Sequence, residues 1–188
     1  MAKAMSAQNS VTPTAEGLAA SVSAVQERGL PPVEKWNPPL SGDLDMRIAR
    51  DGTWFYLGSP ITRPGMVKLF SSILKREGDA FFLVTPVEKW RISVEDAPFV
   101  ATDFDVSGTG EDQVLTFHTH VGDTAVAGSD HPLRVTHDPE TEEPAPYIMV
   151  RAGLEALIDR KSFYRLVELG VARELTGRPT FRLYGIAP

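Results

Sequence analysis

The 188-residue chain contains no cysteine, which excludes disulfide bonds, thiolate catalysis and metal sites built from cysteine ligands. It also lacks any apolar run near the roughly 20 residues that a membrane-spanning helix needs. Its first residues, MAKAMSAQNS, do not contain the continuous apolar core of a secretory signal. We therefore expect a protein of the bacterial cytoplasm with no membrane partner.

Positive charge is sparse as well. The formal net charge is -6, and the 19 lysines and arginines are scattered along the chain. A protein that binds nucleic acid needs a concentrated basic surface, so we expect no nucleic-acid partner. No phosphate-binding loop, dinucleotide-binding glycine motif or serine-hydrolase motif occurs. With 42% hydrophobic and 23% charged residues, the chain has the composition of a globular protein with a real core.

The pattern of turn and apolar residues divides the chain into three parts. Residues 1–35 are predicted to form an N-terminal tail and a helix, which Thr14 caps and Gly29 ends. Residues 36–100 are predicted to form a first half, and residues 101–188 a second half. The connector LPPVEKWNPPL is expected to be extended, because its four prolines exclude a helix or a central strand.

The first half is predicted to contain a hairpin over 46–58, a helix over 63–78, and strands over 80–86 and 88–96. The helix expectation comes from Pro64 in the first turn, an apolar stripe at helical spacing, and a glycine after the last turn.

The second half is predicted to begin with a strand over 100–106 and a hairpin over 114–128 with Gly122-Asp123 at its tip. A strand running into an acidic, proline-rich loop should follow over 129–146. Two helices meeting near Ser162 are predicted over 147–170, and a last strand over 180–187. This order predicts an α+β protein made of two similar, small, antiparallel β-rich halves, each with a hairpin and a packed helix.

The hairpin DGTWFYLG has two conceivable registers. A two-residue turn would place Phe55 and Leu57 with Met46 and Ile48 on one face. A three-residue loop ending at a left-handed glycine would instead place Trp54 and Tyr56 with those two residues. We favour the second register, because it keeps the larger aromatic side chains with apolar partners. In either register large apolar groups lie on both faces, so we expect something to cover the second face.

That cover is either another part of the protein or a flat ligand stacked on Trp54 or Tyr56. Arg63 follows at the start of the predicted helix, where backbone N–H groups and the helix dipole also favour an anion. The alternative for Arg63 is an ion pair with a protein carboxylate such as Asp51. The stretch is thus a candidate ligand site. The alternative is that its aromatic residues and Arg63 have only structural roles.

The four histidines fall within one stretch of twenty residues, and His118 and His120 share one face of a predicted strand. Metal sites in small β-barrels use this spacing. Histidines are also common on the solvated face of a sheet, and no second-shell pattern is visible here. We expect no metal and no cofactor, and we keep a metal-dependent enzyme using His118 and His120 as an alternative.

Two further charged residues are candidates for a ligand site. Arg151 is placed at the start of a predicted helix, where a cation opposes the dipole and needs an anionic partner, either a protein carboxylate or a ligand. Glu88, in TPVEKW, has the chemistry of a general base, but its flanking Lys89 and Arg91 are equally typical of a solvated surface.

Two blocks of the chain resemble a bacterial family known only as domain of unknown function 1285. They are SGDLDMRIARDGTWFYLGSPITRPGMVKLFSSILKREGDAFFLVTPVEKWRISVEDAPF and APYIMVRAGLEALIDRKSFYRLVE. The matching positions are Asp51, Gly52, Trp54, Tyr56, Gly58, Pro60, Ile61, Arg63, Thr85, Pro86, Glu88, Asp96, Pro98, Phe99, Tyr147, Arg151 and Glu155. The resemblance implies a duplicated α+β core with a C-terminal half like a pleckstrin-homology fold. It also implies a nucleotide-type ligand between the halves and a role in signalling, with no established activity.

Together these observations predict a cytoplasmic, non-enzymatic ligand-sensing or interaction module. Its ligand-binding residues are predicted to be Trp54, Tyr56, Arg63, Glu88 and Arg151, and its partner a nucleotide-type small molecule or another protein. A protein-partner scaffold with no small ligand is the second alternative, beside the metal-dependent enzyme.

Overall fold

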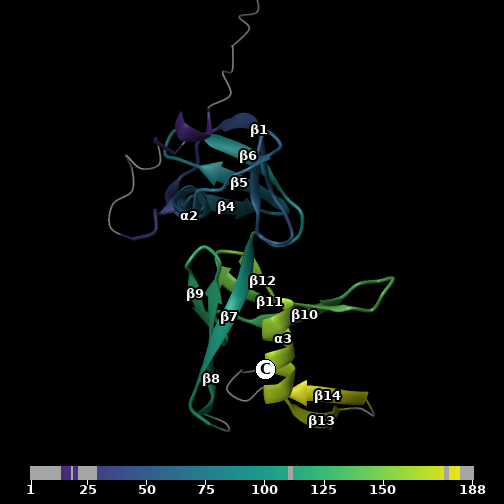
Figure 1. Ribbon diagram of the computed structural model, residues 1–188. Coiled ribbons are helices and arrows are strands. Elements are labelled where there is room, and N and C mark those ends of the chain that lie inside the picture. The colour runs from purple at the N-terminus through teal and green to yellow at the C-terminus, as the bar shows by residue number, and fades with distance from the viewer. Residues whose placement is uncertain (1–13, 18, 21–28, 110–111, 176–177, 183–188) are drawn as a thin grey trace, which may run out of the picture. The chain divides into compact units, whose positions relative to one another are not determined.

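The computed structural model describes residues 14–17, 19–20, 29–109, 112–175 and 178–182 (Figure 1). The chain forms two compact units. The N-terminal unit comprises residues 1–47 and 55–93, and the C-terminal unit comprises residues 48–54 and 94–188. Among the described residues, each unit contains a six-stranded sheet and one helix of nine or ten residues, so the predicted α+β class with two β-rich halves is confirmed.

The sheet of the N-terminal unit has the strand order β3-β2-β1-β6-β5-β4. Its strands are β1 (Leu40–Ile48), β2 (Trp54–Tyr56), β3 (Ser59–Pro60), β4 (Leu74–Glu77), β5 (Ala80–Val84) and β6 (Lys89–Val94). The predicted strands over 80–86 and 88–96 are therefore confirmed as β5 and β6. The proline-rich connector contains only the short 3-10 helix η1 (Val33–Lys35).

The predicted helix over 63–78 is correct only in its first part. Helix α2 (Pro64–Ser72) begins at the expected proline, but residues 74–77 form β4, which pairs with β5. The hydroxyl groups of Ser71 and Ser72 bond to the carbonyls of Lys68 and Leu69 at 2.8 and 2.6 Å. Pairing with the apolar β5 outweighs the helical preference of residues 74–77.

A buried lysine fixes the connector to this sheet. The Lys75 ammonium donates to the carbonyl of Trp36 at 3.0 Å and to Asn37 Oδ1 at 2.9 Å, and it lies 3.5 Å from Glu77. A buried charge needs such partners, because burial without them is costly. The Lys89 ammonium also reaches Glu77 at 2.9 Å, and these contacts lower the pKa of the Glu77 carboxyl.

The hairpin at residues 46–56 has the three-residue loop that we favoured. The Ala49 amide donates to the Thr53 carbonyl, and Gly52 has a φ of +86°. Trp54 is 1% exposed, whereas Phe55 is half-buried, with the Arg47 guanidinium 4.2 Å from the centre of its ring. The expectation that the second face of this stretch is covered is wrong for Leu57, which lies in an exposed turn after β2.

The sheet of the C-terminal unit has the strand order β10-β11-β12-β7-β8-β9. Its strands are β7 (Phe99–Ser107), β8 (Val114–Thr119), β9 (Thr124–Val126), β10 (Leu133–His137), β11 (Pro144–Arg151) and β12 (Leu154–Ile158). All neighbours are antiparallel except β7 and β12, which run parallel with Phe99 opposite Ala156. The strand over 100–106 and the hairpin with Gly122-Asp123 at its tip are confirmed.

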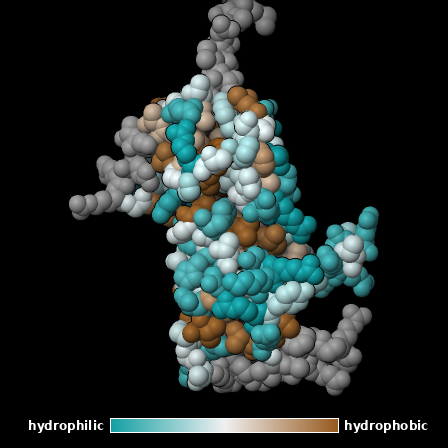
Figure 2. Space-filling view, viewed as in Figure 1, coloured by the Kyte–Doolittle hydropathy of each residue, from teal (hydrophilic) through white to brown (hydrophobic). Residues whose placement is uncertain are grey.

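Helix α3 (Arg160–Leu169) packs against β7, and the short strands β13 (Val171–Leu175) and β14 (Arg178–Arg182) follow it. The core of the unit includes Phe104 and Phe117, whose ring centres are 5.4 Å apart. Between β10 and β11 an acidic loop extends from the sheet, and hydrophilic residues cover this arm (Figure 2). The predicted last strand begins at Arg178, and residues 183–187 of that prediction lie outside the described residues.

The prediction of two helices over 147–170 is wrong, because only the second is present. Residues 144–151 and 154–158 are strands joined by Ala152 and Gly153, both with positive φ, which is the geometry of a tight hairpin turn. Leu154, Ala156 and Ile158 are buried at every second position, as expected for a strand. The alternation is only five residues long, so it was easily mistaken for part of a helical stripe.

Helix α3 starts two residues before Ser162, at a conventional cap. The Asp159 side chain accepts a hydrogen bond from the Ser162 amide at 2.8 Å. Thr14 makes the equivalent bond with the Gly17 amide at 3.0 Å, so the predicted N-terminal cap is confirmed. Residues 21–28 of that predicted helix lie outside the described residues. No helix in the described part of the chain is long and apolar enough to cross a membrane.

Candidate functional site

The five residues predicted to bind a ligand do not form one cluster within either unit. Tyr56, Arg63 and Glu88 belong to the N-terminal unit, and Trp54 and Arg151 belong to the C-terminal unit. Trp54 lies in the core of its unit. Its ring therefore contributes to packing and presents almost no surface.

Tyr56 and Arg63 do line one pocket, which we call the α2 pocket. It has a volume of about 190 Å³ and lies at the start of α2. Its walls are Ala15, Glu16, Tyr56, Ser59, Pro60, Ile61, Thr62, Arg63 and Met66. The Arg63 guanidinium donates to the Glu16 carboxylate at 2.8 Å. The sequence thus placed an aromatic ring and a cation together correctly, but it did not indicate that Glu16 is the partner.

Glu88 closes a tight turn between β5 and β6. The Thr85 amide donates to the Glu88 carbonyl at 2.9 Å, and the Glu88 amide donates to the Thr85 hydroxyl at 3.0 Å. Thr85 is buried, so its hydroxyl supports the turn from inside. These contacts give the backbone of the TPVE segment a structural role.

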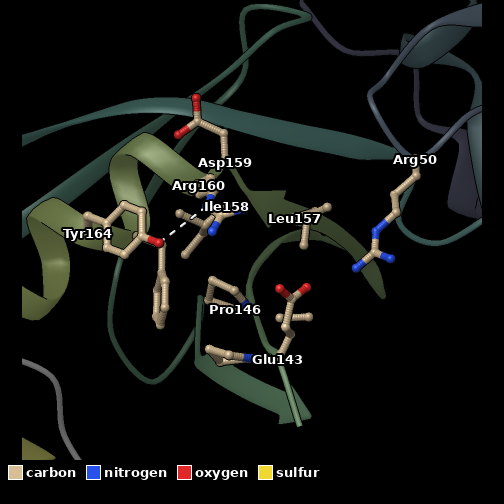
Figure 3. A pocket seen from close by; sticks show the side chains of 11 residues that line it. Arg50, Glu143, Pro146, Leu157, Ile158, Asp159, Arg160 and Tyr164 are labelled. Atoms are coloured by element: carbon tan, nitrogen blue, oxygen red, sulfur yellow. Dashed lines mark hydrogen bonds between the residues drawn. The ribbon is translucent and has the colours of Figure 1, made fainter. Parts of the chain in front are cut away.

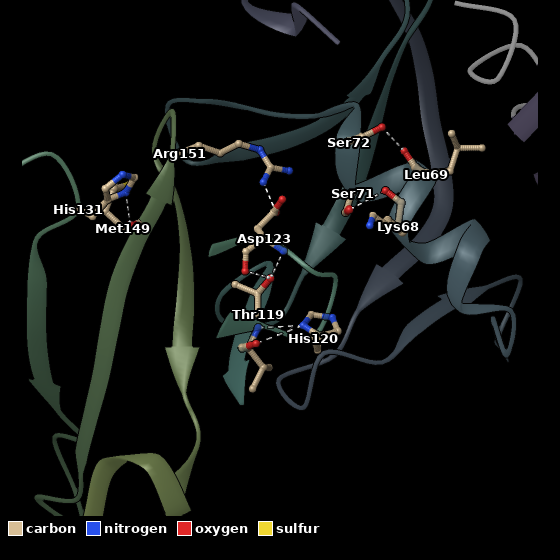
Figure 4. Close-up of polar contacts among 11 residues, drawn as sticks. Lys68, Leu69, Ser71, Ser72, Thr119, His120, Asp123, His131, Met149 and Arg151 are labelled. Atoms are coloured by element: carbon tan, nitrogen blue, oxygen red, sulfur yellow. Dashed lines mark hydrogen bonds and ion pairs between the residues drawn. The ribbon is translucent and has the colours of Figure 1, made fainter. Parts of the chain in front are cut away.

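Arg151 ends β11 rather than starting a helix, and its guanidinium pairs with the Asp123 carboxylate (Figure 4). It also lies 4.9 Å from the centre of the Phe99 ring. The Asp123 amide bonds to the Thr119 hydroxyl at 2.9 Å, which fixes the turn that carries the carboxylate. Of the two partners considered for Arg151, the structure contains the protein carboxylate.

The histidines make separate contacts. His118 bonds to the Asp105 carboxylate at 2.8 Å, and His131 Nδ1 lies 3.0 Å from the Met149 carbonyl. His120 accepts a hydrogen bond from the Val100 amide at 3.1 Å. Partial removal from water lowers the pKa of His120, against the opposing effect of backbone bonds to Val100 and Gly52. Among the described residues no group of three or more histidines, aspartates and glutamates is arranged to hold a metal.

A polar network in the C-terminal unit joins several residues of the family motif. The Tyr147 hydroxyl donates to Asp96 at 2.8 Å, and the other carboxylate oxygen of Asp96 lies 3.1 Å from the Arg50 guanidinium. Arg134 stacks 4.0 Å from the centre of the Tyr147 ring and forms two hydrogen bonds with Glu155. The network therefore holds β10, β11 and β12 in register and fixes the hairpin tip that carries Arg50.

A hollow of the C-terminal unit lies beside this network, and we call it the α3 pocket (Figure 3). Its volume is about 430 Å³. It is lined by Arg50, Glu143, Pro144, Ala145, Pro146, Leu157, Ile158, Asp159, Arg160, Phe163 and Tyr164. Apolar side chains and two aromatic rings form most of the wall, and two guanidinium groups reach it from separate segments.

The charged groups of the α3 pocket differ in how they are engaged. Asp159 caps α3, and Arg160 donates to the Tyr164 hydroxyl at 3.2 Å (Figure 3). Arg50 is held by Asp96, yet its side chain is largely exposed. A second hollow of about 400 Å³ shares Arg50 and Glu143 with this pocket and extends toward the acidic arm.

Sequence reasoning missed the α3 pocket for a definable reason. Arg160 fell just before the predicted junction of two helices near Ser162, because the strand β12 before it was not recognised. Arg50 was considered only as part of a hairpin loop. Recognising Ala152-Gly153 as a hairpin turn would have moved the helix start to Asp159 and placed an arginine in the first turn.

Comparisons with known proteins agree with a two-unit α+β protein. The N-terminal domain model of the domain of unknown function DUF1285 matches residues 31–97, and the C-terminal domain model of the same family matches residues 98–185. No curated protein sequence matches the chain. The chain belongs to the DUF1285 family, as its motifs indicated.

Two solved structures of this family are similar to the chain. A DUF1285 family protein from Silicibacter pomeroyi DSS-3 is 65% identical, with a TM-score of 0.81, over 89% of this chain and 90% of that one. A DUF1285 family protein from Shewanella baltica OS155 is 29% identical, with a TM-score of 0.53, over 66% of this chain and 91% of that one. Both structures agree with the fold described above, and both are described only as DUF1285 family proteins.

Proposed function

We propose that this protein is a ligand-binding module of the bacterial cytoplasm, and that the α3 pocket is the site where it binds a small anionic molecule with a flat apolar body. A nucleotide-type molecule has this chemistry. The observation that carries the proposal is the pocket itself, in which two guanidinium groups border a largely apolar, aromatic wall. Its volume is in the range of about 300–1,000 Å³ that is usual for small-ligand sites.

The two arginines would bind the anionic part of such a ligand. Arg160 is the first residue of α3, so a phosphate or carboxylate beside it would also benefit from the positive end of the helix dipole. Asp159 does not compete strongly for the site, because its carboxylate already caps the helix. Glu143 would limit the charge that the pocket accepts, which favours one anionic group over a long polyphosphate.

The apolar part of the ligand would pack against Phe163, Leu157 and the rings of two prolines. Pro144 and Pro146 have no backbone N–H, so this wall offers apolar surface and carbonyl acceptors. The N–H edge of an aromatic heterocycle is complementary to such acceptors. The predicted residues Trp54, Glu88 and Arg151 have no part in this pocket, and Tyr56 and Arg63 line a different one.

The direct test is a thermal-shift screen of the full chain against mononucleotides, dinucleotides and aromatic carboxylates, followed by calorimetric titration of any compound that stabilises it. Arg160→Gln should weaken binding about tenfold or more, since it removes one charged contact. Lys161→Gln is the matched control, because Lys161 is the next cation on the same helix, is exposed, and does not line the pocket. It should change binding less than twofold.

The proposal would be contradicted if no compound of this class stabilised the protein. It would also be contradicted if a stabilising compound bound equally well to the Arg160→Gln and Lys161→Gln variants. In that case the ligand would bind elsewhere, and Arg63→Gln would show whether the α2 pocket is the site.

A further inference from the structure

A segment of this chain forms part of the wall of the α2 pocket. Ala15 and Glu16 line it together with Tyr56, Arg63 and Met66. Ala15 is only 7% exposed, and the Glu16 carboxylate meets the Arg63 guanidinium at 2.8 Å. The segment thus places a small apolar side chain and a carboxylate beside Arg63 at the edge of the pocket.

The capped start of the helix at Thr14 explains why Ala15 and Glu16 lie next to each other at the pocket. Thr14 caps the first turn through the Gly17 amide, and residues 15–17 are helical. Ala15 and Glu16 are the first two helical residues after the cap. A carboxylate at this position is stabilised by the helix dipole, so the segment offers its negative charge in a favoured geometry.

The family model matches most of the pocket wall but does not match the segment that carries Ala15 and Glu16. The family model begins at residue 31, so Ala15 and Glu16 lie outside it. The rest of the wall, from Tyr56 to Met66, lies inside it. Most of the pocket wall therefore lies in the region that the family model matches, whereas Ala15 and Glu16 belong to a segment that precedes this region.

The energetics indicate that this cover is displaceable. The side chains of Arg63 and Glu16 are each 66% exposed. An ion pair so exposed contributes roughly 0–1 kcal/mol and weakens with salt. Because the segment is covalently attached, it acts at an effective concentration in the millimolar range, which compensates for weak contacts. A competing segment of the same chemistry would therefore shift the equilibrium between the docked and the released state of residues 14–17.

We infer that the α2 pocket is an interaction site for the acidic first turn of a helix, and that residues 14–17 occupy it as an intramolecular ligand. The partner that fits is a protein segment with a capped helix start, a small residue and then a carboxylate. Arg63 binds the carboxylate, and Tyr56, Ile61 and Met66 contact the apolar side of that turn. Binding of the partner displaces the chain's own segment.

The absence of cysteine allows a direct test on the full chain. Ala20→Cys, at an exposed position of the segment, would carry an environment-sensitive fluorophore. The titrant is a synthetic peptide with the sequence of residues 11–29, VTPTAEGLAASVSAVQERG. Adding millimolar peptide should change the emission toward that of the released segment, and the same peptide with Glu16→Gln should need a concentration about two- to fivefold higher.

Arg63→Gln in the labelled protein should shift the emission toward that of the released segment without peptide, and the effect of the peptide should be weaker than on the parent protein. Arg76→Gln is the matched control, because Arg76 is a cation of the same unit that does not line the pocket. It should behave as the parent protein. Exchanging the charges, with Glu16→Arg and Arg63→Glu together, should restore the docked emission.

Two results would overturn the inference. One is an emission that Arg63→Gln does not change, which would mean that the segment does not depend on this pocket. The other is a peptide that acts equally on the Arg63→Gln and Arg76→Gln proteins, which would mean that it binds elsewhere. Circular dichroism of each variant would verify that the fold is retained.

Discussion

Arg151 and Arg63 each form an ion pair with a carboxylate, but they do so in very different surroundings. In the C-terminal unit, Arg151 and Asp123 are 21% and 20% exposed, and Arg151 also lies over Phe99. In the N-terminal unit, Arg63 and Glu16 are three times as exposed, and the carboxylate comes from a segment outside the family model. Both arginines looked like ligand-binding residues in the sequence.

The two arginines have the same kind of partner, a carboxylate. They differ in how rigidly the surrounding backbone holds that carboxylate, and this determines whether the ion pair is structural or exchangeable. Asp123 is fixed by a turn in which its own amide and carbonyl bond to Thr119. Glu16 is carried by the helical turn that Thr14 caps. Arg151 is therefore part of the architecture of its unit, whereas Arg63 can exchange one carboxylate for another.

Removing the carboxylate from each pair should show this difference most strongly. Asp123→Ala removes the carboxylate that pairs with a largely buried guanidinium, so we expect a loss of roughly 2–3 kcal/mol in the free energy of unfolding. Glu16→Ala is the matched variant and should cost less than about 0.5 kcal/mol. Urea unfolding of both proteins measures the two values, and similar losses would mean that the pairs are equivalent.

A pair of glycines extends the comparison to the backbone. Gly52 has a φ of +86°, and a Cβ there would lie 3.0 Å from His120 Nε2 and 3.1 Å from Val100 Cγ2. Gly58, before β3, has a φ of +74° with no atom within 4 Å of that position. Gly58→Ala should therefore cost about 1 kcal/mol from strain alone.

Gly52→Ala should cost roughly 1–3 kcal/mol, because it adds a clash to the same strain. The difference between the two alanine variants isolates the close approach of the hairpin tip to His120. Equal losses in thermal or urea unfolding would show that His120 and Val100 move away without cost.

The region around His120 should also make stability depend on pH. Since its pKa is lowered by partial burial, the folded state favours the neutral imidazole. The unfolded state therefore binds a proton more readily, and stability should fall as the pH drops below the ordinary histidine value of about 6.5. Asp123 and Asp51 face His120 and oppose this effect without reversing it.

His120→Gln should flatten the dependence of the free energy of unfolding on pH between about 7 and 5. His118→Gln serves as the comparison, because His118 lies on the same sheet and pairs with Asp105. If the two variants had identical pH profiles, the turn at residues 119–123 would not be the origin of the effect.

The smallest effect is expected at Arg63. Arg63→Gln should change the free energy of unfolding by less than about 0.5 kcal/mol, because the guanidinium is exposed and the N-terminal cap of α2 uses no side chain. A loss above 1 kcal/mol would place Arg63 among the structural residues, together with Arg151.

The sequence predicted best where local signals were strong. Continuous apolar β5, alternating β6, the Gly122-Asp123 turn and the loop ending at Gly52 were all recognised, because each depends on residues close together in the chain. The errors at β4 and at β11–β12 have one origin. The strands in these places are only four to eight residues long, and pairing with a partner strand, which single-sequence patterns do not reveal, determines their state.

The site residues show the same limit. That Tyr56 and Arg63 lie near one another followed from their positions at two ends of one short segment. That Arg50 and Arg160 border one hollow did not follow, because the contact joins segments more than a hundred residues apart. The partner of Arg151 was correctly described as a carboxylate, but its identity, Asp123, depends on the hairpin β8–β9 meeting the end of β11.

The hairpin tip at residues 48–54 gives the chain an unusual order of assembly. It is made before most of the N-terminal unit but belongs to the C-terminal unit, where Ile48, Gly52 and Trp54 are buried. During synthesis these residues can become buried only after Val100, His120 and the strands that follow have been made. A fragment cut at the family boundary, before residue 98, would leave the C-terminal unit without this tip, so the two units are better studied in one chain or as co-expressed pieces.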